Sequence, residues 1–228
     1  MPNIWQNVLL TFQVVTGQML DKFIILGYSG HAYSVIEAIQ SNEQIVHGYC
    51  ESQKQEKNPF QLEYIGNEKN IDLNSFKSEN VFFPCIGDPK IREQLVEFIL
   101  TRQLKQTNVI HKNAYISQSV KLGNSVFIGN GVIINPAVDI GNGAIINTRA
   151  LVEHECYISD FVHVAPGAIL GGNVKIGKSS LIGIGSVVRP GIKIGKNCII
   201  GAGSVVVTDI EDGMVYAGNP AKRIKKNE

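Results

Sequence analysis

The feature that most constrains the fold is a six-residue period that runs through the second half of the chain. Every sixth residue from Ile110 to Val206 is aliphatic, and no insertion breaks the phase. A period sustained over about a hundred residues is typical of a repeat architecture. The seventeen positions are Ile110, Ile116, Leu122, Ile128, Ile134, Ile140, Ile146, Val152, Ile158, Val164, Leu170, Ile176, Ile182, Val188, Ile194, Ile200 and Val206.

A second, smaller residue stands four positions after each of these aliphatic residues, for example Ala114, Val120 and Cys156. Glycine often follows the aliphatic residue directly, where a tight corner favours a residue without a Cβ atom. One large and one small inward residue in every six predict short strands joined by corners, with three strands in a coil of about 18 residues. The sequence therefore predicts a left-handed parallel β-helix over residues 109–228, with Cys156 and Cys198 packed inside it.

The first half of the chain has a different pattern, in which short apolar segments alternate with helix-like segments. Strands are predicted at 22–26, 45–49, 64–65 and 81–86, and helices from about 30 to 41 and from 89 to 104. Asp88 is placed to cap the second helix. This alternation predicts a small Rossmann-like α/β domain over residues 22–108. Residues 1–21 are expected to form an N-terminal extension, and residues 51–58 a mobile loop.

Composition excludes several classes of function. Twenty-one Lys and Arg against 20 Asp and Glu leave a net charge of +1, which supplies no field for nucleic acid or an anionic membrane. The four cysteines form no CxxC pair, so neither a zinc knuckle nor a disulfide framework is predicted. Residues 1–20 are too polar for a membrane helix and lack the basic start of a signal peptide. We expect a cytoplasmic protein with no membrane span and no nucleic-acid partner.

The interior of a β-helix is closed, so catalytic side chains must lie at outward positions. One segment carries an unusual group of residues at these positions. His154 occupies an outward position between Glu153 and Glu155. An imidazole beside a carboxylate is suited to act as a general base, although a solvated surface cluster gives the same tripeptide. One coil further on, Gly172 is expected to stack on His154 at about the 4.8 Å strand spacing. Its N–H could then serve as an oxyanion donor near the base.

A second histidine of the repeat, His163, lies nine residues after His154, which is half a coil. The two side chains are therefore expected to face different directions within one chain. They can share a pocket across a subunit interface if triangular prisms pack around a three-fold axis. We predict a homotrimer with its sites in the clefts between subunits, while an incidental surface histidine remains the alternative for His163.

Two further segments suggest anion binding without establishing it. The turn Gly27-x-x-Gly30 lies between a strand and a helix, where backbone amides can approach a phosphate. It lacks the full GxGxxG spacing, so a merely tight turn is equally compatible. The basic stretch 222–226 is either a solvated C-terminus or a contact for a cofactor phosphate.

From about Lys22 to its end, the chain resembles the bacterial nucleotide-sugar N-acetyltransferases of the bacillosamine pathway and the related sialic-acid O-acetyltransferase-like proteins. The resemblance covers about nine tenths of the sequence. The motifs that carry it are GYSGHA at 27–32, IGDPKIR at 86–92, VEHEC at 152–156, FVHVAPGA at 161–168, GGNVKIG at 171–177 and GNPAKRI at 218–224.

The resemblance implies an acetyl-CoA donor and a nucleotide-linked amino sugar as acceptor. Direct transfer is expected because no cysteine or serine lies beside His154 at an outward position to act as a nucleophile, and no metal is expected. The resemblance makes His154 the general base, with Glu155 raising its basicity and Asn147 holding it. The positions that match acetyl-CoA contacts are His163, Gly172, Ile184 and Ala202. Those that match the sugar-nucleotide pocket are Ser29, Gly30, His31, Glu51 and Gly87. The family often has consecutive aspartates where this chain has Glu51-Ser52, so the resemblance does not fix the nucleotide.

Four other functions were weighed. An O-acetyltransferase acting on a sialic acid or another sugar hydroxyl is the nearest, because the same base can deprotonate a hydroxyl. A zinc lyase of the γ-carbonic-anhydrase kind needs three clustered histidines, and the repeat holds His111, His154 and His163 at unsuitable spacing. A non-catalytic scaffold leaves the histidine–glutamate cluster unexplained. A nucleotidyltransferase would need a glycine-rich loop with basic residues for triphosphate chemistry.

Overall fold

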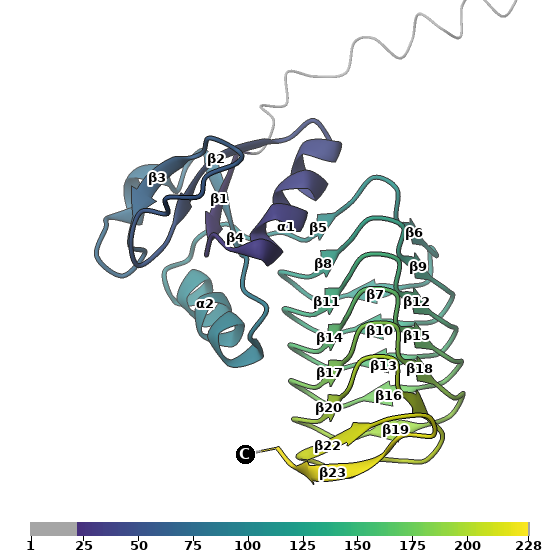
Figure 1. Ribbon diagram of the computed structural model, residues 1–228. Helices are drawn as coiled ribbons and strands as arrows, with labels where there is room; N and C mark the ends of the chain where they lie inside the picture. The colour runs from purple at the N-terminus through teal and green to yellow at the C-terminus, as the bar shows by residue number, and fades with distance from the viewer. Residues whose placement is uncertain (1–21, 228) are drawn as a thin grey trace, which may run out of the picture.

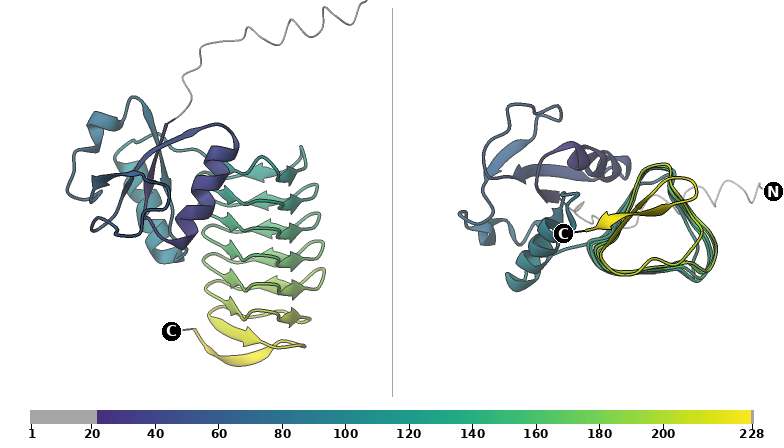
Figure 2. Two further views of the ribbon diagram at one scale, coloured as in Figure 1. Left: turned by 45° about the horizontal axis from the view of Figure 1, so that its top comes forward. Right: turned by 60° about the horizontal axis from the view of Figure 1, so that its bottom comes forward.

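The structure is a computed structural model that describes residues 22–227, and it consists of an α/β domain beside a triangular β-helix (Figures 1 and 2). The expected N-terminal extension lies outside the described residues. Among those that are described, no helix is long and apolar enough to cross a membrane.

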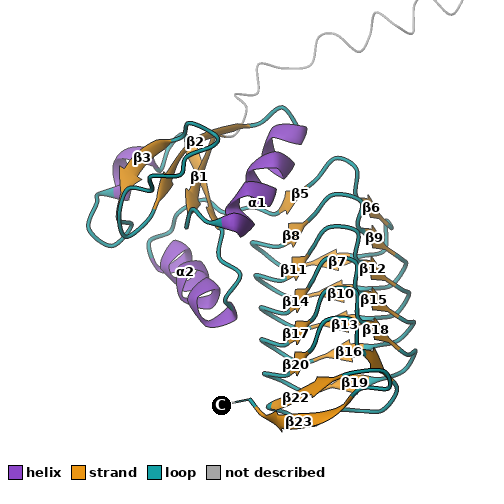
Figure 3. Ribbon diagram, viewed as in Figure 1, coloured by secondary structure: helices purple, strands orange, loops and turns teal. Residues whose placement is uncertain are grey.

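The N-terminal domain is a four-stranded parallel sheet in the order β3-β2-β1-β4 with helices packed on it (Figure 3). Its apolar strand residues form the core together with the buried face of each helix. The elements are β1 (Lys22–Leu26), α1 (Gly30–Ser41), β2 (Ile45–Cys50), β3 (Glu63–Gly66), a 3-10 turn (Leu73–Phe76), β4 (Asn80–Pro84) and α2 (Pro89–Thr101).

Two local features of this domain differ from the prediction. Helix α2 ends at Thr101 and not near residue 104, because Leu104 leaves the helical path and packs separately into the core. The segment 51–58 is irregular, as predicted, yet it is tied to the domain at two points. The Tyr28 hydroxyl donates to Asn58 Oδ1 at 2.6 Å, and the Gln55 N–H donates to the Tyr49 hydroxyl at 3.0 Å.

The predicted parallel β-helix is confirmed. Each expected aliphatic position is the second residue of a two-residue strand, and strands 18 residues apart pair in parallel register, for example Ile145 with His163. These strands are β5 (Val109–Ile110), β6 (Tyr115–Ile116), β7 (Lys121–Leu122), β8 (Phe127–Ile128), β9 (Ile133–Ile134), β10 (Asp139–Ile140), β11 (Ile145–Ile146), β12 (Leu151–Val152), β13 (Tyr157–Ile158), β14 (His163–Val164), β15 (Ile169–Leu170), β16 (Lys175–Ile176), β17 (Leu181–Ile182), β18 (Val187–Val188), β19 (Lys193–Ile194), β20 (Ile199–Ile200) and β21 (Val205–Val206).

The interior of the prism is a single apolar column, in which the predicted inward cysteines, Cys156 and Cys198, are both buried. A hairpin of β22 (Met214–Ala217) and β23 (Lys222–Lys226) closes the C-terminal end. All five residues of β23, the predicted basic tail, are exposed.

The first residue of each short strand points outward, so each of the three sheets presents one column of side chains. The sheet of β5, β8 and β11 presents Val109, Phe127 and Ile145, which are buried against helix α1. The two domains therefore pack directly on each other, as expected from the absence of a linker, and share one apolar cluster.

The phase of the repeat can be tested with two adjacent residues. Ile158 is fully buried inside the prism, whereas Tyr157 before it is 52% exposed. We expect Ile158→Ala to lower the free energy of unfolding by about 2–5 kcal/mol, because it leaves a cavity. The matched control Tyr157→Ala should cost less than about 1 kcal/mol. Chemical denaturation of both variants checks this, and equal losses would contradict the assigned phase.

Candidate active site

His154 lies in the corner between β12 and β13, with its side chain 57% exposed. Its Nδ1 is 3.0 Å from Glu155 Oε2. The carboxylate accepts the Nδ1 proton, so Nε2 carries the free lone pair. Glu155 adopts a left-handed backbone conformation with φ 59°, as do Ala137 and Asn173 at the same place in neighbouring coils. The corner itself therefore turns the carboxylate toward the imidazole.

Gly172 stacks on His154 in the next coil, as its sequence position predicts. A Cβ atom at Gly172 would lie 2.6 Å from both Cε1 and Nε2 of His154. A larger residue here would displace the imidazole ring from its present position, so glycine permits this close approach. The Gly172 N–H donates to no other described residue in the hydrogen-bond network. An imidazole and a free backbone donor thus lie side by side on one edge of the prism.

Asn147 contacts His163 within the chain, and not His154 as the resemblance suggested. Its Oδ1 accepts from the Thr148 N–H at 2.8 Å, which turns its Nδ2 toward His163 Nε2 at 3.1 Å. An amide that donates to Nε2 selects the His163 tautomer with its proton on Nδ1. His163 starts β14, on a different sheet from the corner of His154, so the predicted separation of the two histidines is confirmed.

His31, which belongs to the N-terminal domain, lies near His163. Its ring centroid is 6.3 Å from that of His163 and 5.2 Å from that of Phe127. Burial, and then the charge of His163 and Arg92, lower the pKa of His31 to about 3. Burial and Arg92 lower the pKa of His163 to about 4. The buried Nε2 of His31 has no hydrogen-bond partner within the described part of the chain.

Ser29, Gly30 and Gly87 lie at the carboxyl ends of β1 and β4, the neighbouring strands at which the chain changes direction across the sheet. Ligands of open α/β sheets bind at such a point. The Ser29 side chain makes no capping bond to α1, and a Cβ atom at Gly30 or Gly87 would meet nothing within 4 Å. These two glycines therefore leave open space beside the backbone instead of serving local packing.

Glu51 follows β2 and is already engaged. Its Oε2 accepts from the Tyr28 N–H at 3.2 Å, and its Oε1 accepts from the Ser52 N–H at 2.8 Å. The carboxylate thus braces the turn that leads to Ser29. Among the residues predicted to bind the sugar nucleotide, Glu51 is thus the one that stabilises the turn.

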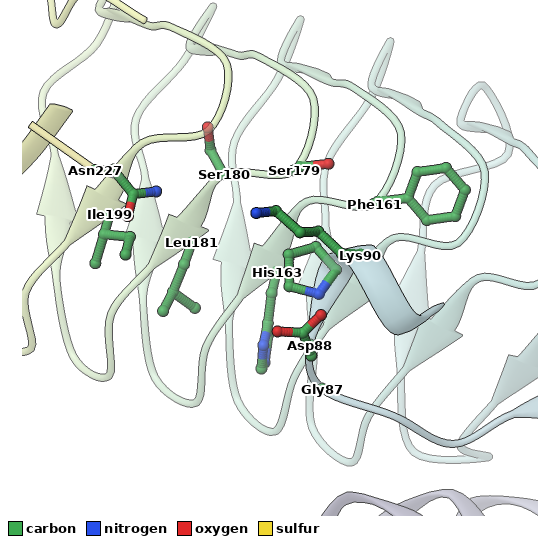
Figure 4. A pocket seen from close by; sticks show the side chains of 11 residues that line it. Gly87, Asp88, Lys90, Phe161, His163, Ser179, Ser180, Leu181, Ile199 and Asn227 are labelled. Atoms are coloured by element: carbon green, nitrogen blue, oxygen red, sulfur yellow. The ribbon is translucent and has the colours of Figure 1, made fainter. Parts of the chain in front are cut away.

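A cavity of about 520 Å³ lies between the start of α2 and the sheet of β14, β17 and β20 (Figure 4). Gly87 and His163, which were assigned to different ligands, both line it. Below His163, the register-matched Leu181 and Ile199 give the cavity an apolar wall. The cavity thus lies between Gly87, just before α2, and the outward side chains of the β-helix.

Ile184 and Ala202 stack 18 residues apart in the corners that follow β17 and β20, and Ile184 is 60% exposed. These corners form a different edge of the prism from that of His154 and Gly172. Both edges border the same sheet, which is built from β6, β9, β12, β15, β18 and β21. The two groups of candidate residues thus lie on the two edges that border one face.

Arg92 is the residue that the sequence analysis missed. It was quoted in a motif but given no role, since an arginine in a helix ordinarily lies at the surface. It is 1% exposed and lies within the interface between the domains. The available signal was its spacing, because Arg92 falls in phase with Leu95, Val96 and Ile99 on the apolar face of the helix.

Within residues 22–227, no group of three or more His, Cys, Asp or Glu side chains is arranged to hold a metal ion. His154 beside the free N–H of Gly172 is an arrangement suited to acyl transfer, because an imidazole can accept a proton and a backbone N–H can donate to an oxyanion.

Comparison with known proteins agrees with this chemistry. The family model of the PglD N-terminal domain matches residues 22–99, and models of bacterial transferase hexapeptide repeats and of the hexapeptide repeat of succinyl-transferase match 173–208 and 111–136. A GDP-perosamine N-acetyltransferase of Escherichia coli O157:H7 is 32% identical over 151 residues, which are 64% of this chain and 68% of the relative.

Two solved structures resemble the whole described chain. A histidine-to-asparagine variant of perosamine N-acetyltransferase from Caulobacter crescentus, in complex with CoA and GDP-perosamine, is 32% identical, with a TM-score of 0.86 over 90% of this chain and 97% of the relative. The acetyltransferase domain of PglB from Neisseria gonorrhoeae, in complex with acetyl-CoA, is 31% identical, with a TM-score of 0.85 over 90% and 100%. This chain belongs to the family of acetyl-CoA-dependent sugar N-acetyltransferases that join a PglD N-terminal domain to a hexapeptide-repeat β-helix.

Proposed function

We propose that this protein transfers the acetyl group of acetyl-CoA to the amino group of a nucleotide-linked sugar, a 4-amino-4,6-dideoxy sugar carried on GDP. The observation that carries the proposal is the pairing of His154 with Glu155 beneath the open N–H of Gly172. The GDP-perosamine bound by the relatives supports the choice of nucleotide. All four cysteines are buried and free, in keeping with the cytoplasmic location that we also propose.

His154 acts as the general base in this proposal. The sugar amine attacks the thioester carbonyl carbon while His154 Nε2 accepts a proton from the amine. Glu155 stabilises the imidazolium that forms. The Gly172 N–H donates to the oxyanion of the tetrahedral intermediate. The intermediate then collapses, the carbon–sulfur bond breaks, and His154 returns the proton to the CoA thiolate.

The nucleotide diphosphate binds beside Ser29, Gly30 and Gly87. The open space at both glycines and the N-terminus of α1 favour an approaching anion. The unpartnered Nε2 of His31, the residue after Gly30, supports a ligand near this turn, because a buried nitrogen without a hydrogen bond costs about 1–3 kcal/mol. The acceptor sugar then lies between this pocket and the β-helix, where the cavity opens.

The enzyme assembles as a homotrimer, and its apolar face supports this. Of the three outward columns, one packs against α1 in its upper part and lines the cavity further on, and one is polar, with Lys121, Asp139, Tyr157, Lys175 and Lys193. The third column consists of Tyr115, Ile133, Leu151, Ile169, Val187 and Val205. Tyr115 is 61% exposed and Ile133 43%. A continuous exposed apolar column indicates a protein interface.

Turning this face toward a three-fold axis brings one edge of each prism against the other edge of its neighbour. The edge of His154 and Gly172 then meets the edge of Ile184 and Ala202 of the next subunit, with His163 nearby. Acetyl-CoA lies in the cleft between the two edges. The two groups of candidate residues, which lie on different edges of one chain, come together as one site in this arrangement.

The decisive assay measures thiol release from acetyl-CoA with a panel of GDP-, UDP- and dTDP-linked 4-amino-4,6-dideoxy sugars, with sialic acid as the hydroxyl acceptor. We expect turnover of the GDP-linked amino sugar. Turnover of sialic acid alone would instead identify an O-acetyltransferase. With the preferred acceptor, His154→Ala should reduce kcat by about 10² to 10⁴ while the protein stays folded. A His154→Ala variant with normal turnover would exclude this base.

Mixing two inactive variants tests the shared site. His154→Ala and His163→Ala each disable one half, so homotrimers of either variant should have little activity. After co-refolding in equal amounts, random trimers should regain about a quarter of the wild-type sites, because a site needs one intact half from each variant. Separately refolded samples that are then combined serve as the control. Activity no greater than in this control would place both histidines in one subunit's site.

The lowered pKa values of His31 and His163 predict acid sensitivity. Both are neutral in the folded protein at pH 7, whereas in the unfolded chain they titrate near the ordinary value of 6.5. The unfolded state therefore binds more protons below pH 6.5, and stability falls as the pH drops toward 4, by up to about 1.4 kcal/mol per pH unit for each histidine. Urea unfolding at fixed protein concentration should show a shallower dependence for His31→Leu. An unchanged slope would contradict the lowered pKa of His31.

A further inference from the structure

Arg92 is a buried cation that bonds to main-chain oxygens on both domains. Its Nε donates to the Gly143 carbonyl at 2.7 Å, and its NH2 donates to the Phe161 carbonyl at 2.7 Å. Its NH1 donates to the carbonyls of Ile86 at 3.0 Å and Gly87 at 2.7 Å. None of the ion pairs between described side chains includes Arg92. The guanidinium is satisfied by carbonyl dipoles from three separate segments.

The segments on the β-helix side are fixed without Arg92. Gly143 and Phe161 stand 18 residues apart in consecutive coils, and their N–H groups donate to Asn124 and Asn142 in the preceding coils. This edge of the β-helix therefore keeps its position without the bonds from Arg92. The loop between β4 and α2 differs, because within the described chain the carbonyls of Ile86 and Gly87 accept hydrogen bonds from Arg92 alone. The bonds from Arg92 thus determine where the loop lies relative to the β-helix coils.

The position of this loop matters because Gly87 lines the cavity opposite His163, the residue two places after Phe161. A shift of the loop would change the distance between the nucleotide pocket and the β-helix. Burial lowers the pKa of Arg92 to about 10, so the side chain remains charged at neutral pH. The planar fork of arginine reaches several oxygens in fixed directions, which the single ammonium of lysine cannot do.

We propose that Arg92 is a positioning residue that sets the register between the sugar-nucleotide pocket and the acetyl-transfer cleft by fixing the Ile86–Gly87 loop against the β-helix corners at Gly143 and Phe161. The inference rests on the proposed function, since it concerns how the same nucleotide sugar is presented. Arg92 touches neither substrate nor reacting atoms in this account. Its effect reaches the acceptor through Gly87.

A neighbouring ion pair provides a matched control for simple attachment of the domains. Glu93 and Lys178 join α2 to the β-helix at 2.5 Å, and Lys178 also lies over the Phe161 ring. Neither side chain bonds to the Ile86–Gly87 loop. Glu93→Gln weakens the contact between the domains while leaving that loop in place. An effect of Arg92 that reflects only domain attachment should be reproduced by Glu93→Gln.

The test compares Arg92→Lys, Arg92→Met and Glu93→Gln with the wild type in two measurements. Steady-state kinetics should give a KM for the nucleotide sugar raised by about ten- to a hundredfold in both Arg92 variants, with a much smaller change in the KM for acetyl-CoA. Arg92→Lys, which keeps the charge, should be closer to wild type than Arg92→Met. Amide hydrogen exchange of the free protein should accelerate at Cys85 and Ile91, whose bonded N–H groups flank the loop, and stay slow at 143 and 161. Glu93→Gln should show neither effect.

A wild-type KM for the nucleotide sugar in Arg92→Lys would overturn the proposal, as would an equal rise in Glu93→Gln. If Arg92→Met does not fold, Arg92→Lys alone decides. If the wild-type protein acetylates no nucleotide sugar, the proposed function fails, and hydrogen exchange then judges the positioning separately. Faster exchange at Cys85 and Ile91 in Arg92→Lys supports the positioning, and unchanged exchange overturns it.

Discussion

The constant pairing of residues 18 positions apart is the constraint on which the rest of the structure depends. Each coil repeats the hydrogen bonds of the one before it, and the inward aliphatic residues form one uninterrupted column. Because the phase never slips, the outward residues fall into fixed columns as well. Gly172 therefore lies directly on His154, and His163 lies on a different sheet from both. The same repeat that builds the core thus determines on which edge or face of the prism each candidate site residue lies.

Much of this arrangement follows from the sequence alone. The hexapeptide period predicts the β-helix, its inward cysteines and the stacking of Gly172 on His154, because a regular solenoid converts sequence separation directly into position. The alternating pattern before it predicts the parallel sheet and the cap of α2, where Asp88 accepts from the Ile91 N–H at 2.9 Å. These are local or periodic features, and no long-range folding information is needed to find them.

Contacts between the two domains could not be predicted in the same way. The link between Asn147 and His163, the burial of His31 and the four bonds of Arg92 depend on how the α/β domain sits on the β-helix. No period relates residue 92 to residues 143 and 161. The resemblance placed Asn147 beside His154, whereas the chain itself places it beside His163. The difference is resolved if the two histidines meet across a subunit interface, as the proposed trimer requires.

The central claim is that one site is built from two subunits, with His154 as the base. A crystal structure of the wild-type protein with CoA and a GDP-linked amino sugar tests it most directly. The account predicts the CoA sulfur within about 3–4 Å of His154 Nε2 and near the Gly172 N–H of one subunit, with the nucleotide against Gly30 and Gly87 of its neighbour. A CoA sulfur far from every His154, or both ligands held by one chain alone, would contradict it.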